Sequence, residues 1–121
     1  AIHRDRRGAG WRTVEAPLAL PAALTGTPEA PALVDCLTLW LSNLMLAGVD
    51  HDAAADALEA ALRRRATPTV LVANEVGSGI VPDNALARRF RDAAGLLNQR
   101  IAALADRVVL VVAGLPLVLK G

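Results

Sequence analysis

The sequence predicts an α/β domain with a mostly parallel sheet that helices cover on both faces. Three short apolar segments alternate with segments whose apolar residues have helical spacing. An apolar run without polar alternation is typical of a strand buried on both faces, as in a parallel sheet. At 121 residues, the chain has the length of one domain.

The first 31 residues are predicted to hold no long helix or strand. The opening segment is basic and interrupted by Gly8 and Gly10, which favours a loop or a frayed helix end. Four prolines follow between Pro17 and Pro31, so this stretch is predicted to be a connection with at most a short helix near residues 18–24.

The middle of the chain is predicted to hold a strand and two helices. Residues 32–37 form a short apolar run interrupted by Asp35, which indicates a buried strand. Residues 38–47 are rich in Leu and are followed by Gly48, which predicts a helix with a glycine at its end. Residues 52–65 have Ala and Leu at helical spacing.

Two further strands and a long helix are predicted in the remainder. Residues 70–76 are β-branched and apolar up to Asn74, and the Gly-Ser-Gly-Ile-Val-Pro segment after them indicates a loop. Residues 84–105 have one apolar stripe and predict a long helix. Residues 108–113 predict a third buried strand, closed by Gly114 and Pro116.

Composition excludes several classes of protein. The chain is 54% hydrophobic with a mean hydropathy of +0.38, yet no run approaches the ~20 apolar residues of a spanning helix. A net charge of +1 argues against a general nucleic-acid or membrane-surface binder. The single Cys36 excludes a multi-cysteine zinc site and an internal disulfide, which favours a reducing, cytoplasmic location.

Two polar segments follow predicted strands, where ligands bind in parallel sheets. Asp35 ends the first strand and suits a Mg²⁺ contact, or else it caps the next helix. Glu75 follows the second strand beside Gly77 and Gly79, whose backbone N–H groups can approach a ligand closely. The alternative for Glu75 is an ion pair with the Arg88-Arg89 pair.

A third constellation is His3 among arginines near the N-terminus. An imidazole nitrogen can attack phosphorus when arginines neutralise the phosphate oxygens, although a histidine in a basic loop is also commonly just solvated. His51 is expected near a helix start capped by Asp50 or Asp52, without a metal role. Trp11, Trp40 and Cys36 are expected to be packing residues, and Arg88–Arg91 a solvated helix face.

Four segments together resemble the bifunctional adenosylcobinamide kinase / adenosylcobinamide-phosphate guanylyltransferase family of cobalamin biosynthesis. They occur in the family's order and span nearly the whole chain. The segments are His3-Arg4-x-x-Arg7 with Trp11–Pro17 (WRTVEAP), Val34–Met45 (VDCLTLWLSNLM), Asn74–Pro82 (NEVGSGIVP) and Leu86–Gly95 (LARRFRDAAG) through Asn98-Gln99.

The resemblance implies a P-loop, RecA-like sheet, assembly as a homotrimer, and two reactions. In the first, a nucleoside triphosphate (ATP or GTP) phosphorylates the aminopropanol hydroxyl of adenosylcobinamide. In the second, a histidine takes GMP from GTP, releases pyrophosphate, and passes GMP to adenosylcobinamide phosphate. The implied products are adenosylcobinamide phosphate and then adenosylcobinamide-GDP, with no nucleic-acid or membrane partner.

The resemblance also assigns roles by position. His3 is implied to be the guanylylated nucleophile. Asp35 is implied to contact the nucleotide and to act through Mg²⁺. The other implied nucleotide contacts are Arg4, Asp5, Arg6, Arg7 and Glu15.

One departure from the family pattern affects the expected activity. The family's Gly-rich P-loop and first strand do not occur in these 121 residues, and Lys120 is the only lysine. We therefore expect the chain to correspond to the C-terminal two-thirds of one nucleotide-transferase domain, inactive by itself. The alternatives are a non-catalytic remnant that acts as a binding or assembly module, and a family member that keeps only one activity.

Overall fold

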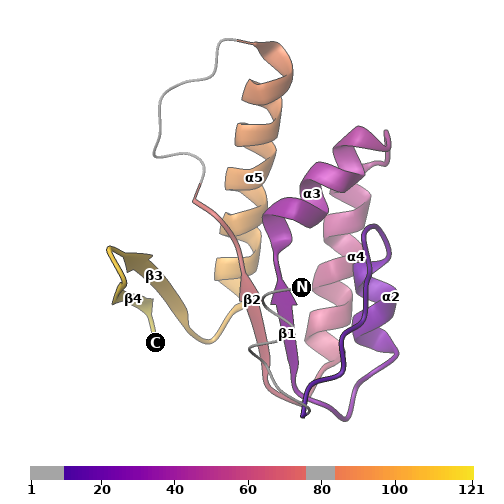
Figure 1. The fold of residues 1–121 in the computed structure, drawn as a ribbon, viewed down its shortest axis with the longest axis vertical. Helices are drawn as coiled ribbons and strands as arrows, with labels where there is room; N and C mark the ends of the chain where they lie inside the picture. The colour runs from indigo at the N-terminus through magenta and orange to yellow at the C-terminus, as the bar shows by residue number, and fades with distance from the viewer. Residues whose placement is uncertain (1–9, 76–83) are drawn as a thin grey trace.

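The computed structural model describes residues 10–75 and 84–121, and within them it is an α/β structure. Figure 1 shows a pair of strands with helices packed beside it and a separate hairpin at the C-terminal end. No helix among the described residues is both long and apolar enough to cross a membrane. In chain order the elements are α2 (Leu20–Thr25), β1 (Ala32–Asp35), α3 (Leu37–Leu46), α4 (His51–Arg64), β2 (Thr69–Val72), α5 (Ala85–Leu104), β3 (Val108–Val112) and β4 (Leu115–Lys120).

Each of the three longer helices begins at a side-chain cap. Asp50 Oδ1 accepts hydrogen bonds from the N–H groups of Asp52 and Ala53 (3.0 and 3.1 Å) at the start of α4. Asn84 Oδ1 accepts from Ala87 N–H (2.7 Å) at the start of α5. Because such caps satisfy N–H groups that the helix leaves unpaired, they fix where a helix starts. The predicted boundaries of these helices are confirmed to within one or two residues.

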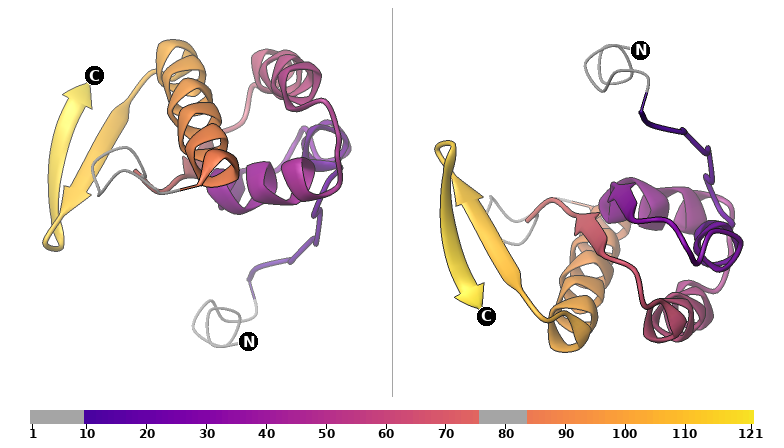
Figure 2. Two further views of the ribbon diagram at one scale, coloured as in Figure 1. Left: turned by 90° about the horizontal axis from the view of Figure 1, so that it is seen from above. Right: turned by 90° about the horizontal axis from the view of Figure 1, so that it is seen from below.

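The strands β1 and β2 are parallel, as predicted. Their register pairs Leu33 with Val70, Val34 with Leu71 and Asp35 with Val72. Val34 is buried and Leu71 packs against the core, so this pair faces the helices. Figure 2 shows α4 and α5 on one side of β2, whereas the N-terminal described residues lead away on the other.

The expectation that helices cover both faces of the sheet is wrong for the described residues. Leu33, Val70 and Val72 alternate with the buried pair and are 42%, 58% and 40% exposed. The apolar run was a sound indicator of a strand, but it does not reveal whether a second layer exists. This pair of strands therefore has one packed face and one open face.

The core lies between the helices and the packed face of β1. Among the described residues it is aliphatic apart from Trp40, which is 4% exposed. Leu58 of α4 is completely buried, and Phe90 of α5 packs on the margin of the core. The buried residues are Leu20, Leu24, Val34, Leu37, Trp40, Leu41, Leu44, Ala55, Leu58, Ala61, Ala93, Ala94, Leu97 and Ile101.

The last two strands differ from the prediction of a third buried parallel strand. The strand β3 is present, but it pairs antiparallel with β4 in a sheet of its own, and β4 was not predicted. Ala113 and Gly114 both have positive φ (52° and 75°), as a tight two-residue hairpin turn requires. The hairpin is largely exposed, so residues 108–113 are not a buried strand here.

Candidate active site

The carboxyl ends of β1 and β2 meet at one edge of the parallel pair, as predicted. Asp35 is the last residue of β1 and lies in register with Val72, the last residue of β2. The Asp35 side chain is exposed, and the described part of the chain offers its carboxylate no hydrogen-bond or ion-pair partner. Such a carboxylate is available to a ligand at the edge where parallel sheets bind ligands.

The alternative that Asp35 caps the following helix is wrong. The N-cap of α3 is Cys36, whose Sγ accepts a hydrogen bond from Leu39 N–H at 3.4 Å. Cys36 is half-buried and serves as this cap, rather than as a core hydrophobe. The thiol is a weak acceptor and an uncommon cap, so the sequence pattern favoured the neighbouring carboxylate.

The peptide of Asn74, two residues beyond β2, is held by two helices. Its N–H donates to Thr38 Oγ1 of α3 at 2.8 Å, and its carbonyl accepts from Asn98 Nδ2 of α5 at 3.2 Å. Glu75 follows directly and is exposed, and among the described residues no ion pair joins it to Arg88 or Arg89. The strand β2 ends at Val72, beside Asp35, and residues 76–83, for which the sequence predicts a loop, lie outside the described residues.

Two side chains of α3 hold the segment that comes before α2. Trp40 Nε1–H donates to the carbonyl of Leu18 at 3.0 Å, and Asn43 Nδ2 donates to the carbonyl of Pro17 at 3.2 Å. Glu15 is exposed in this segment. The packing role expected for Trp40 is confirmed, whereas Trp11 is 52% exposed and does not pack in the core.

The histidine cluster cannot be placed relative to these residues. His3, Arg4, Asp5, Arg6 and Arg7 all lie outside the described residues. The described chain shows only where the segment that follows them is attached, at the middle of α3.

The described residues fit a Mg²⁺ ion that the nucleotide largely coordinates. They contain no group of three or more His, Cys, Asp or Glu residues able to form a protein cage for a metal. Mg²⁺ in nucleotide sites is commonly held by one or two carboxylates together with phosphate oxygens and water. The exposed carboxylate of Asp35, which has no partner in the described part of the chain, meets that requirement.

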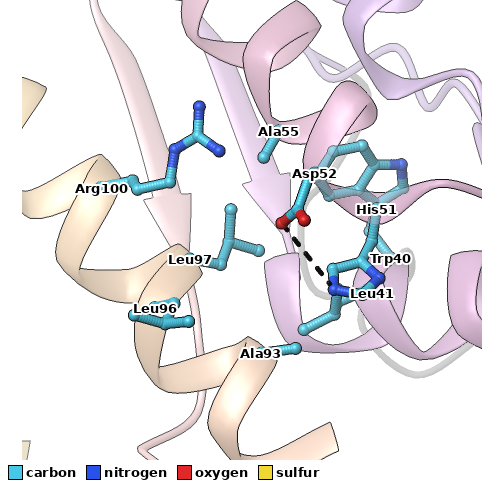
Figure 3. A pocket seen from close by; sticks show the side chains of 9 residues that line it. All are labelled: Trp40, Leu41, His51, Asp52, Ala55, Ala93, Leu96, Leu97 and Arg100. Carbon is cyan, nitrogen blue, oxygen red and sulfur yellow. Dashed lines mark ion pairs between the residues drawn. The ribbon is translucent and has the colours of Figure 1, made fainter. Parts of the chain in front are cut away.

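A small hollow between α3, α4 and α5 is lined by helix residues alone (Figure 3). Its volume of about 40 Å³ has room for water but not for a nucleotide. His51 is the first residue of α4, and its Nε2 lies 3.9 Å from Asp52 Oδ1. The remaining lining residues are Trp40, Leu41, Ala55, Ala93, Leu96, Leu97 and Arg100.

Arg100, at the rim of this hollow, joins α5 to α4. Its guanidinium donates to both carboxylate oxygens of Glu59 (3.3 and 3.0 Å) and to Asp56. The hydrogen bond from Arg100, helped by its charge, lowers the pKa of the Glu59 carboxyl, and the same carboxylates raise the pKa of Arg100. The charges of Arg100, Glu59 and Asp56 compensate one another, which indicates that these residues have a structural role in joining α5 to α4.

A wider groove of about 280 Å³ separates the end of α3 from the start of α5. Apolar side chains line most of it, and Leu46 and Leu86 are 79% and 54% exposed. No pattern in the sequence predicts this groove. Its lining residues are Ser42, Met45, Leu46, Asn84, Leu86, Ala87 and Phe90.

Comparison with known proteins gives a consistent set of relatives. A family model described as cobinamide kinase / cobinamide phosphate guanyltransferase matches residues 1–119. The chain is 50% identical to the bifunctional adenosylcobalamin biosynthesis protein CobP of Pseudomonas aeruginosa over 125 residues, which cover all of this chain and 72% of the relative. It is 42% identical to the Salmonella typhimurium protein CobU and 39% identical to that of Escherichia coli, each over 98% of this chain and 75% of the relative.

Proposed function

Because the chain belongs to the cobinamide kinase / cobinamide phosphate guanyltransferase family, we propose that it serves both of that family's reactions in cobalamin biosynthesis. In the kinase reaction, the aminopropanol hydroxyl of adenosylcobinamide attacks the γ-phosphorus of ATP or GTP. The bond from that phosphorus to the bridging oxygen breaks, a nucleoside diphosphate leaves, and the hydroxyl proton is lost. The product is adenosylcobinamide phosphate.

The guanylyl transfer proceeds in two displacements at the α-phosphorus of GTP. A ring nitrogen of His3 attacks first, so that a P–N bond forms, the bond to the bridging oxygen breaks, and pyrophosphate leaves. A phosphate oxygen of adenosylcobinamide phosphate then attacks the same phosphorus, the P–N bond breaks, and the imidazole is regenerated. The product is adenosylcobinamide-GDP. Covalent catalysis of this kind divides one difficult transfer into two easier ones.

The charged residues of the site have distinct parts in this proposal. Arg4, Arg6 and Arg7 neutralise the triphosphate oxygens and favour the departure of pyrophosphate, while Asp5 and Glu15 contact the nucleotide. Asp35 holds Mg²⁺, which when bound withdraws charge from the phosphate oxygens. Assembly as a homotrimer on a P-loop fold is part of the same proposal.

The observation that carries the proposal is the position of α3. Asp35 precedes this helix by two residues, Thr38 holds the peptide that follows β2, and Asn43 donates to the carbonyl of Pro17. The helix belongs to one of the four segments on which the family resemblance rests, and its side chains contact two of the others. These contacts support a single nucleotide site shared by both reactions.

The decisive experiment is intact mass spectrometry of the protein expressed from its complete gene, before and after incubation with GTP and Mg²⁺. The 121 residues account for 12.6 kDa. We expect a gain of one GMP that is absent in His3→Ala and that disappears when adenosylcobinamide phosphate is added. The variant Arg107→Ala, on the exposed approach to β3, is the matched control and should still be labelled.

Two results would contradict parts of the proposal. Labelling that persists in His3→Ala would place the nucleophile elsewhere. A protein that gains no GMP but phosphorylates adenosylcobinamide would keep only the kinase activity, and one that does neither would be a binding or assembly module.

A further inference from the structure

The hydrogen-bond ladder between β1 and β2 ends at the edge where Asp35 of the proposed nucleotide site lies. The last paired residues are Asp35 and Val72, so Asn74 lies beyond the ladder. A backbone that leaves a sheet edge must find other partners or remain solvated. Here the partners of Asn74 are two side chains, which form hydrogen bonds with its backbone N–H and its backbone carbonyl.

The side chains of Thr38 and Asn98 form hydrogen bonds with the backbone of Asn74. They belong to two helices that are far apart in sequence. The Thr38 hydroxyl accepts from Asn74 N–H at 2.8 Å, across 36 residues of chain. The Asn98 amide donates to the Asn74 carbonyl at 3.2 Å, across 24 residues. Both bonds have the length of ordinary hydrogen bonds, and together they fix the position and the rotation of this residue.

Both side chains project from well-anchored parts of their helices. Thr38 lies in the first turn of α3 between the buried Leu37 and Trp40, and Asn98 follows the buried Leu97 in the middle of α5. Neighbours that are locked in the core leave the two polar side chains little freedom to move. The two side chains therefore hold the Asn74 backbone in a fixed position, as the positioning of a reacting group requires.

We propose that Thr38 and Asn98 are positioning residues that fix the Asn74 peptide and thereby orient Glu75 at the carboxyl end of β2, the edge of the parallel pair where Asp35 also lies, for phosphoryl and guanylyl transfer. This inference rests on the proposed function. The two bonds lie at an exposed edge, so their loss costs little stability. We expect their loss to lower the reaction rate instead, because a small misplacement of reacting groups greatly slows a reaction.

The test uses conservative substitutions in the protein expressed from its complete gene. Thr38→Val keeps the shape of the side chain but removes the acceptor, and Thr38→Ser retains it. We expect kcat for phosphorylation of adenosylcobinamide to fall roughly tenfold to a hundredfold in Thr38→Val. Thr38→Ser should restore most of the rate, and KM for the triphosphate should change much less than kcat.

Asn98→Asp removes the donor and is expected to lower kcat to a similar extent. Gln99→Glu, which adds the same charge at the next position of α5, should leave kcat unchanged. Thr27→Val is a second control, since Thr27 Oγ1 donates to the carbonyl of Ala23 in α2, on the amino-terminal side of β1. Its thermal midpoint should fall about as much as that of Thr38→Val, without a loss of rate.

Hydrogen exchange at the amide of Asn74 provides a readout that does not depend on turnover. This amide should exchange slowly in the wild type and much faster in Thr38→Val. Rapid exchange in the wild type, or wild-type kcat in Thr38→Val and Asn98→Asp, would overturn the inference. If the wild type catalyses neither reaction, the proposed function fails, and the exchange measurement alone decides whether Thr38 holds the peptide.

Discussion

Arg65, the residue that follows α4, holds the chain at the amino ends of both parallel strands. Its guanidinium donates to the carbonyl of Leu24 in α2 and to those of Thr27 and Ala30 in the connection from α2 to β1. It also donates to the hydroxyls of Thr67 and Thr69, at the entrance to β2. Only a planar, five-donor side chain can serve so many acceptors at once.

Replacing Arg65 should destabilise the fold more than replacing any neighbouring arginine. We expect Arg65→Ala to lower the free energy of unfolding by about 2–3 kcal/mol, because several carbonyls lose a charged donor. Arg65→Lys should recover only part of this loss, since an ammonium lacks the fork geometry. Urea denaturation would measure both effects, with the exposed Arg64→Ala as the control. Equal midpoints for Arg65→Ala and Arg64→Ala would show that the contacts contribute nothing.

At the scale of elements, α4 and α5 are joined by the ion pair between Glu59 and Arg100. The hydrogen bond from Arg100 lowers the pKa of Glu59 from its ordinary 4.5 in the folded protein. A lowered carboxyl pKa stabilises the fold above the unfolded pKa, and that stabilisation is lost as pH falls through the folded value. The ion pair between Glu59 and Arg100 is therefore expected to stabilise the fold less in acid.

The pH dependence of the stability of Glu59→Gln tests the contribution of this ion pair. The stability difference between wild type and Glu59→Gln should be constant near neutral pH and should shrink below about pH 4.5. Urea midpoints measured over this range would give the difference directly. The exposed Glu29→Gln is the control for removal of a carboxylate. A difference between wild type and Glu59→Gln that does not change with pH would contradict the assignment.

Helices and parallel strands could be predicted because their signals are local. Asp50 and Gly48 mark helix ends, and short β-branched runs mark the strands. The strand β4 was missed because Gly114 and Pro116 indicated only the end of β3, whereas they belong to a hairpin turn and to the edge of a two-stranded sheet. Whether an apolar run is covered depends on other layers, which the run itself does not specify.

The candidate site could be predicted only in part, for a similar reason. The position of Asp35 follows from the strand pattern and the parallel pairing. The contacts of Asn74 with Thr38 and Asn98 depend on how three elements pack, and a pattern of residue types along the chain does not record such packing. The predicted role of His3 remains a prediction.

At the scale of the whole molecule, the described residues expose many large apolar side chains, both on the open face of β1 and β2 and on the hairpin. In the hairpin the most exposed are Val111 and Leu115, at 65% and 70%.

Self-association is the expected consequence of this exposed apolar surface. Edge strands with apolar side chains and no charges pair readily with other chains. Sedimentation velocity over a wide dilution series should show oligomers of the chain. Val111→Lys in β3 should shift the distribution toward the monomer, whereas Ala57→Lys, at an exposed position of α4, should not. A chain that remains monomeric at every concentration would argue against this surface as a contact, and against the trimer.

The contrast between the two tryptophans gives the protein an intrinsic optical reporter. Trp40 is 4% exposed and donates to the carbonyl of Leu18, whereas Trp11 is 52% exposed. Their emission therefore comes from two environments, an apolar interior and a solvated chain segment. A soluble quencher such as iodide reaches Trp11 and spares Trp40. The quenched fraction of the emission therefore reports the solvent exposure of the chain segment that follows His3, and no dye needs to be attached.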